Sequence, residues 1–244
     1  LIFAAFLCFL ILFTACDTDT YPTATTNDTE TGTGGNDTST GNNDSGNSSD
    51  SSDFSDVENI GDHDSAADYI WNDADIIRIT LNGNAIQADT SDTTVNGSTL
   101  TITSAGTYDI SGSLSDGRII VDTTDKDIVR LILDQATIHN ATGAPIYIKN
   151  ARKAMIVMAG NTTNHISDGT SYRFDDSGSD EPNAAIYSAA DLTIYGNGSL
   201  TVEGNYNDGI ASKDGLIITL GSITVHAADD GIRGKDYIVV KGGD

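Results

Sequence analysis

Short apolar runs alternate with polar turns from residue 76 to the last residue of the sequence. The runs are rich in Ile, Val, Leu and Thr, and Gly, Asn and Asp separate them. This alternation is typical of strands joined by turns, and no window has the period of a helix. The pattern therefore predicts an all-β domain. The expected strands are residues 76–81, 99–103, 107–111, 118–121, 129–133, 146–148, 154–158, 185–187, 192–195, 199–202, 210–211, 216–220, 223–226 and 237–240.

One turn-and-strand unit repeats near the C-terminus. Residues 207–214 return as residues 229–236, so that Ile232 stands where Ile210 stood, and a weaker copy places Ile186 at the same point one period earlier. A period in the low twenties favours a solenoid in which each repeat forms one coil, over a β-sandwich. We therefore predict a single-stranded parallel β-helix in which Ile186, Ile210 and Ile232 form an inward-facing ladder.

Two irregularities qualify this repeat. The step from Ile120 to Ile146 has about the length of one coil, whereas the step from Ile146 to Ile186 is much longer. We expect an insertion at residues 160–183 to account for the difference. The sequence ends directly after a strand, and a solenoid without a cap exposes a bare edge, so we expect further coils beyond Asp244.

The part of the chain that precedes the β-domain divides into three segments. Residues 1–15 are almost wholly apolar and match the core of a signal peptide without its start, and residues 12–16 resemble a lipobox that would leave a lipid on Cys16. Residues 16–56 are polar and acidic, which predicts a disordered tether. Residues 57–76 form an acidic connection to the β-domain at 77–244. The protein is therefore expected to be extracytoplasmic, either anchored to a membrane by this lipid or simply secreted.

The charge is strongly negative and unevenly distributed. The net charge is −24, and no Lys or Arg precedes Arg78. From that residue onward 21 acidic side chains face 12 basic ones, a net charge of −9. Such a surface disfavours nucleic acid, whose binding needs clustered Lys and Arg. The acidic side chains serve either solubility or cation binding.

Several motifs in the second half of the domain occur in a recognisable order. They are residues 181–186 (EPNAAI), 191–194 (DLTI), 196–202 (GNGSLTV), 205–214 (NYNDGIASKD) and 228–236 (ADDGIRGKD). This series resembles a bacterial carbohydrate-binding family of right-handed parallel β-helices, similar in shape to family 9 polysaccharide lyases. The resemblance covers residues 77–244 and is most specific after Gly160. It implies an association with calcium and with plant cell-wall polysaccharides, including pectic acid.

The repeated acidic turns are the candidate metal site. Coils stack about 4.8 Å apart, so Asn207 and Asp208 should lie over Asp229 and Asp230. Stacked carboxylates repel each other unless a cation lies between them, and Ca²⁺ prefers six to eight oxygen ligands. The alternative is that these residues only close tight turns before Gly.

Cationic and aromatic residues near the repeats are candidates for polysaccharide binding. Lys213, Arg233 and Lys235 could pair with uronate carboxylates, or they could be ordinary exposed charges. The aromatic residues around the insertion could stack on sugar rings, or they could pack within the solenoid or cap it; they are Tyr172, Phe174, Tyr187 and Tyr206. A calcium-dependent lyase would use Lys213 or Lys235 as its base; otherwise no catalytic residue is expected.

These observations predict a lipid-anchored, monomeric protein that binds acidic or plant cell-wall polysaccharide with the help of calcium. Two other functions fit the same sequence: a calcium-dependent polysaccharide lyase, and a structural or adhesive surface protein.

Overall fold

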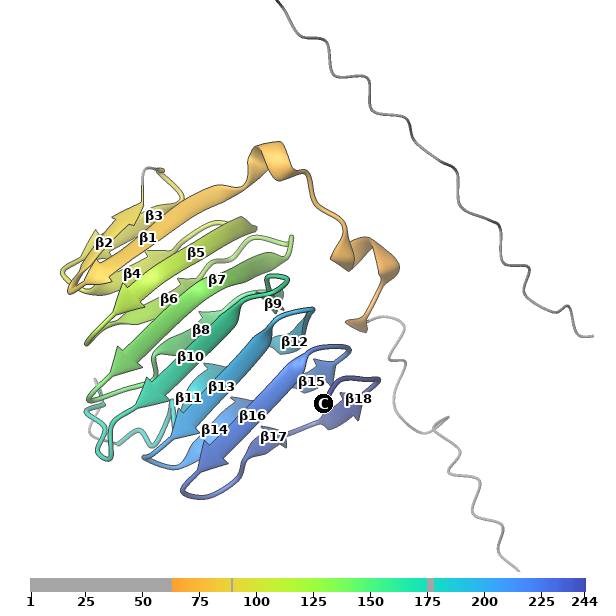
Figure 1. The fold of residues 1–244 in the computed structure, drawn as a ribbon. Helices are drawn as coiled ribbons and strands as arrows, with labels where there is room; N and C mark the ends of the chain where they lie inside the picture. Colours follow the sequence, from red (N-terminus) through yellow and green to blue (C-terminus); the bar gives the residue numbers. More distant parts are fainter. Residues whose placement is uncertain (1–62, 89, 175–177) are drawn as a thin grey trace, which may run out of the picture. The chain divides into compact units, whose positions relative to one another are not determined.

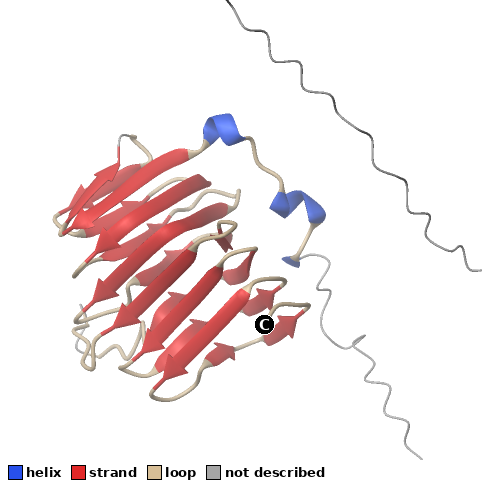
Figure 2. Cartoon of the chain, viewed as in Figure 1, coloured by secondary structure: helices blue, strands red, loops and turns tan. Residues whose placement is uncertain are grey.

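A computed structural model describes residues 63–88, 90–174 and 178–244, and these ranges are almost entirely β-structure (Figure 2). Two short 3₁₀-helices, η2 (Ala66–Tyr69) and η3 (Asp73–Asp75), precede the strands. The predicted all-β class is confirmed. No helix in the described ranges is long and apolar enough to cross a membrane. The predicted signal peptide, lipid-bearing Cys16 and tether lie outside the described residues.

The strands follow one another in a regular order. Their bounds are β1 (Ile77–Gly83), β2 (Ala85–Ala88), β3 (Thr93–Asn96), β4 (Thr99–Ile102), β5 (Gly106–Leu114), β6 (Arg118–Asp122), β7 (Val129–Asn140), β8 (Ile146–Asn150), β9 (Lys153–Met158), β10 (Thr163–Asp168), β11 (Ala184–Ser188), β12 (Asp191–Gly196), β13 (Ser199–Gly204), β14 (Asp208–Ser212), β15 (Gly215–Ile218), β16 (Ser222–Ala227), β17 (Ile232–Gly234) and β18 (Tyr237–Val240).

The second half of the domain consists of stacked coils (Figure 1): β8–β10, β11–β13 and β14–β16 have three strands each, and β17 and β18 follow. Strands β8, β11, β14 and β17 pair in parallel in one sheet, which β6, β4 and β3 extend to seven strands. Strands β9, β12, β15 and β18 pair in the same way, as do β10, β13 and β16. The long strand β7 joins these two rows into one 11-stranded sheet, because β9 pairs with its first half and β10 with its second.

Aliphatic side chains fill the space between the sheets. Ile146, Ile186, Ile210 and Ile232 are successive register partners in the 7-stranded sheet, and the first three are fully buried. Ile232, on the last coil, is partly buried against the same core. The predicted inward-facing ladder is therefore present. Burying each of these side chains stabilises the fold by about 1.5–3 kcal/mol.

Two details of the predicted coils were wrong. Residues 163–168, expected to lie in an insertion, form β10 and pair with β7 and β13, so the extra residues are confined to the loop 169–183. In addition, Ile119 and not Ile120 is the register partner of Ile146. Because side chains alternate along a strand, this shift by one position places Ile120 on the outer face of the sheet, opposite Tyr147.

The first strands are not purely parallel, contrary to the prediction for residues 77–244. Strand β1 pairs with β2 and β3 pairs with β4 in antiparallel hairpins. Their tight turns are Gly83-Asn84 and Gly97-Ser98, and both glycines have positive φ values, 65° and 61°. Gly followed by Asn or Ser between strands is a hairpin signal, so the sequence did contain the information for β2 and β3.

The segment 63–76, which we call the strap, contacts the coils and is more than a connection. Lys153 on β9 is 2% exposed, and its Nζ lies 2.9 Å from Asp68 Oδ2 and 3.7 Å from Asp64 Oδ1. Tyr69 packs edge-on against Tyr195 of the next coil, with ring centroids 4.7 Å apart. The strap is therefore fixed to the domain by a buried ion pair and by aromatic packing. All described residues belong to one compact unit, Ser52–Asp244.

Candidate functional site

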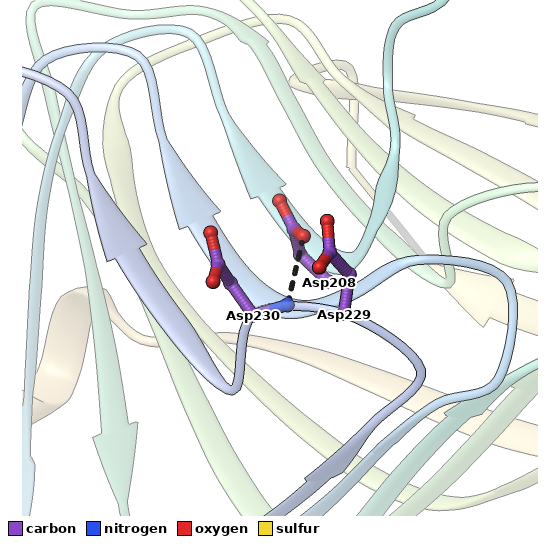
Figure 3. Close-up of side chains that lie close together, drawn as sticks. All are labelled: Asp208, Asp229 and Asp230. Carbon is purple, nitrogen blue, oxygen red and sulfur yellow. Dashed lines mark hydrogen bonds between the residues drawn. The ribbon is translucent and has the colours of Figure 1, made fainter.

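Two acidic turns lie directly over one another at the start of β14 and β17. The Asp229 N–H donates to the Asn207 carbonyl at 2.9 Å, and the Gly209 N–H donates to the Asp230 carbonyl at 2.9 Å. These backbone bonds hold the carboxylates of Asp208, Asp229 and Asp230 on the same side of the turns, with one oxygen of each within 4.8 Å of the others (Figure 3). The structure thus brings together the carboxylates of three of the four predicted metal ligands; the fourth, Asn207, has no carboxylate.

Asp208 is the buried member of this acidic cluster, and its side chain is 1% exposed. Its Oδ1 accepts hydrogen bonds from the Asn207 side-chain amide at 2.8 Å and from the Asp230 N–H at 3.3 Å. Its Oδ2 lies 2.7 Å from Arg233 Nη2. Burial raises the pKa of Asp208, the Arg233 guanidinium opposes this, and the nearby Asp230 and Asp229 carboxylates add to it.

Arg233 therefore places its positive charge against the buried carboxylate of the cluster. From the sequence, Arg233 was a candidate for uronate binding or an ordinary exposed charge, but its guanidinium reaches Asp208 and lies 3.4 Å from the Asn183 side-chain oxygen. Three carboxylates provide the hard oxygen atoms that Ca²⁺ prefers, and backbone carbonyls and water could complete six to eight ligands. The donor chemistry fits calcium, with two differences from the prediction: Asn207 turns its amide nitrogen toward Asp208, and Arg233 competes for that carboxylate.

The two candidate lysines lie at the opposite end of these strands. Lys213 follows β14 and Lys235 follows β17, stacked through the Lys235 N–H and the Ser212 carbonyl. Lys213 Nζ forms an ion pair with Glu181 Oε2 at 2.7 Å, and Lys235 is exposed. The whole length of β14 separates Lys213 from Asp208, which is about 16 Å along a strand. Neither lysine is therefore beside the acidic cluster, where a calcium-assisted lyase would need its base.

Two of the candidate aromatic residues, Tyr187 and Tyr206, pack against other aromatic rings of the protein. Tyr187 is 2% exposed, which contradicts its predicted role in stacking on a sugar ring. It lies on the outer side of β11, edge-on to Tyr147, beneath the loop 169–183. Tyr206 stacks face to face on Tyr172 at 4.2 Å, and the Tyr172 hydroxyl donates to Asp168 Oδ2 at 2.7 Å. One face of Tyr206 is thus covered by another ring.

A groove lies on the outer face of the 7-stranded sheet, and of its lining residues the sequence indicated only Tyr172 and Phe174 as candidates for sugar binding. It has a volume of about 300 Å³. Its floor consists of outward-facing residues of β4, β6 and β8, and residues 172–174 and 179–182 form one wall. The lining residues are Thr101, Arg118, Ile120, Asp122, Gly143, Tyr147, Lys149, Tyr172, Arg173, Phe174, Ser179, Glu181 and Pro182.

The sequence did contain a signal for this groove. Residues 118, 120 and 122 alternate with the buried residues 119 and 121, and residues 147 and 149 alternate with 146 and 148. Once the strands are placed, this period of two assigns a cationic and aromatic row to the outer face. The wall could not be predicted in the same way, because loop residues carry no such period.

Comparisons with known proteins find relatives that are described as carbohydrate-binding. A family model described as "Carbohydrate-binding domain-containing protein" matches residues 96–244. A protein of that description from Acetivibrio thermocellus is 42% identical over 151 residues, which are 62% of this chain and 53% of that protein. The chain thus spans about half the length of this relative. A solved structure of a polysaccharide lyase-like protein from C. thermocellum, a gadolinium derivative, is 34% identical with a TM-score of 0.64, covering 68% of this chain and 79% of that chain.

Proposed function

The chain belongs to the family of carbohydrate-binding domain-containing proteins, and from this premise we propose that it binds an acidic, uronate-containing polysaccharide of the plant cell-wall type with the help of calcium. The family match over residues 96–244, which include both the acidic cluster and the groove, is the observation that carries the carbohydrate part of the proposal. In this proposal the coils form a right-handed parallel β-helix that acts as a monomer.

Calcium has a physical reason to take part. From Arg78 onward the chain carries a net charge of −9, and a polyuronate is also anionic. The two would repel each other unless local cations dominate or an added cation bridges them. The cluster of Asp208, Asp229 and Asp230 offers hard oxygen ligands in a fixed geometry, which supports a calcium ion at this position. Bound there, the ion would reduce the negative charge that faces the polysaccharide.

The proposal places the domain outside the cytoplasm. The lipobox-like sequence at Cys16 and the polar residues 16–56 support a lipid anchor followed by a long tether. The strap then connects this tether firmly to the coils through Lys153. Labelling the full-length protein with a radioactive fatty acid, with Cys16→Ala as the control, tests the anchor. A wild-type protein that incorporates no label would contradict lipidation at Cys16.

Retention of the purified domain on immobilised polygalacturonate tests the binding proposal. We expect retention in millimolar calcium and release by a chelator, because removing the ion restores the repulsion between two anionic surfaces. A neutral matrix of the same support serves as the control. Equal retention with calcium and with chelator would remove calcium from the proposal, and failure to bind any polysaccharide in a broad glycan array would remove carbohydrate binding itself, leaving a structural or adhesive role.

A polysaccharide lyase is the second candidate, favoured by the name of the solved structural neighbour. The separation of about 16 Å between Lys213 and the acidic cluster argues against a base that acts beside a calcium ion at that position. A lyase leaves an unsaturated uronate, which absorbs ultraviolet light. Steady growth of this absorbance with the wild-type protein, abolished by Lys213→Ala or Lys235→Ala, would establish the enzyme and refute the purely binding function.

A further inference from the structure

We propose that the groove on the 7-stranded sheet is a uronate subsite, in which Arg118 and Arg173 bind the carboxylate of a sugar ring. The inference rests on the proposed function, since it names where on the domain the acidic polysaccharide is recognised. It replaces Lys213, Lys235 and Arg233, the cations that the sequence suggested for this role.

The charge of the groove differs in sign from that of the domain. Its two described carboxylates already have partners: Asp122 Oδ2 lies 2.7 Å from Lys149 Nζ, and Glu181 Oε2 lies 2.7 Å from Lys213 Nζ. Burial alone would raise the pKa of Glu181, yet the Lys213 ammonium keeps this pKa below its ordinary value, so Glu181 is ionised and paired. The acidic side chains of the lining are therefore neutralised by lysines.

The two arginines, in contrast, form no ion pair within the described part of the chain. Among the described residues, neither Arg118 nor Arg173 forms a side-chain hydrogen bond either. Arg118 extends from β6 at the floor, and Arg173 stands on the wall, where its backbone N–H donates to the Thr142 carbonyl at 2.9 Å. A guanidinium presents a fork of N–H donors that matches a carboxylate, so two of them at one groove favour a carboxylate-bearing ligand.

The rest of the lining suits a sugar ring. Tyr147 and Phe174 offer apolar surface, and Thr101 carries a hydroxyl group for hydrogen bonding. The Ser179 hydroxyl, in contrast, already bonds the backbone of Glu181. The volume of about 300 Å³ lies at the lower end of the range of about 300–1,000 Å³ that is usual for small-ligand sites. An isolated small anion would need none of this apolar surface. The combination of rings, hydroxyls and arginines therefore indicates an acidic sugar.

A second hollow continues from the first, which points to a polymer. It also has a volume of about 300 Å³ and shares Arg118 and Arg173 with the groove. Its other lining residues are Ser98, Thr99, Asp116, Gly117, Asn140 and Thr142. This lining is polar and uncharged except for Asp116 and the shared arginines, and Asp116 would repel a second carboxylate. We therefore place the uronate carboxylate in the groove and a neighbouring sugar, bound through its hydroxyls, in the second hollow.

Substitution of the arginines tests the subsite. The variants are Arg118→Gln, Arg173→Gln and the double variant, and Arg152→Gln, an exposed arginine outside both hollows, is the matched control. Titration calorimetry on the full chain would use an oligogalacturonate and the same oligosaccharide after reduction of its carboxyl groups. We expect wild type to prefer the acidic probe by at least about tenfold, the double variant to lose this preference, and Arg152→Gln to keep it.

A steric variant provides an independent test. Gly143 lines the groove, and an added Cβ would meet Asn140 Oδ1 at 3.6 Å and Arg118 Nη1 at 3.7 Å, which are ordinary contacts. Gly143→Leu should therefore fold, as a melting curve would verify, and should weaken binding of both probes by about tenfold or more because it fills the groove.

The outcomes separate this inference from the proposed function. If the double variant and Gly143→Leu bind the acidic probe as tightly as wild type, the subsite is wrong while carbohydrate binding stands. If wild type binds both probes equally, the carboxylate recognition is wrong. If wild type binds neither these probes nor any polysaccharide in an array, the proposed function fails, and the subsite fails with it.

Discussion

Replacing Arg233 with Gln should expose the competition between the guanidinium and calcium for Asp208. Arg233 Nη2 lies 2.7 Å from Asp208 Oδ2 and is the positive charge that the structure places against this buried carboxylate. If calcium binds the cluster through Asp208, it must displace this contact. The variant should therefore be less stable than wild type without calcium and should gain more from its addition.

The size of the effect follows from the burial of the two partners. Leaving a buried polar group without its partner costs about 1–3 kcal/mol. Arg233 is 45% exposed, so solvent screens part of the pair and we expect about 1–2 kcal/mol. For a domain of this size, that loss lowers Tm by roughly 2–8 °C in the presence of a chelator. If calcium displaces Arg233 as proposed, the calcium-bound forms of both proteins would lack the Arg233–Asp208 pair, and their Tm values should converge at saturating calcium.

Thermal melting in chelator and at increasing calcium concentrations measures both effects. A ligand at 100 times its Kd stabilises a protein by about 2.7 kcal/mol, which is easily detected. Lys235→Gln is the matched control, because it removes one positive charge from the same coil without touching Asp208, and it should change Tm little in either condition. Identical Tm values of Arg233→Gln and wild type in chelator, together with identical gains from calcium, would refute the competition. A full calcium gain in Asp208→Asn with Asp230→Asn would show that the ion binds elsewhere.

Four further substitutions test the fold and its stability. Ile210→Ala should lower the free energy of unfolding by about 2–5 kcal/mol in a urea titration, because Ile210 is fully buried between Ile186 and Ile232. Ile232→Ala, on a partly buried residue, should cost less, and equal losses would contradict the ladder. Lys153→Met should cost about 3–5 kcal/mol and accelerate proteolysis within the strap, because two carboxylates lose their buried partner; unchanged cleavage would show that the strap is held by other contacts. Burial and the Asp134 carboxylate raise the pKa of Asp109 above its ordinary value of 3.8. The folded state therefore holds the Asp109 proton more tightly than the unfolded state does. The domain loses stability as the pH rises from 3.8 through the higher pKa of the folded state. Asp109→Asn should therefore stabilise the domain by about 1 kcal/mol at neutral pH, and a gain that persists below pH 3.8 would contradict this explanation.

The repeat predicts the second half of the fold well because it reports a physical periodicity. Ile210 and Ile232 occupy the same position in successive coils, so their spacing directly gives the register of β14 and β17. The same approach was less accurate at Ile120, where no motif fixes the register and a choice between adjacent isoleucines decides which one faces the core. Local turn chemistry, not the repeat, determines the hairpins formed by Gly83 and Gly97.

The candidate site was harder to predict because it depends on contacts between distant segments. Stacking of the acidic turns follows from the repeat, but the reach of Arg233 to Asp208 depends on side-chain direction. Arg118 and Arg173 lie far apart in the sequence, and the placement of residues 172–174 over the outer face brings them to one groove. The burial of Tyr187 was hard to predict for the same reason. Its ring lies on the outer side of β11, and packing against residues such as Tyr172 leaves it 2% exposed.

The positions of the groove and the acidic cluster suggest how an anionic domain could hold an anionic polymer. Tyr147, Tyr187, Ala211 and Arg233 are successive outward-facing partners across the 7-stranded sheet, so three strand spacings, about 14 Å, separate the groove floor from the residue that contacts the cluster. A polyuronate lying along the stack of coils would therefore meet the arginines at one point and the proposed calcium ion at another. Each cation offsets repulsion over only about a Debye length, roughly 8–10 Å, so one alone would leave much of this surface repulsive. The arginines and the proposed calcium ion together would therefore offset the repulsion over more of this surface than either would alone.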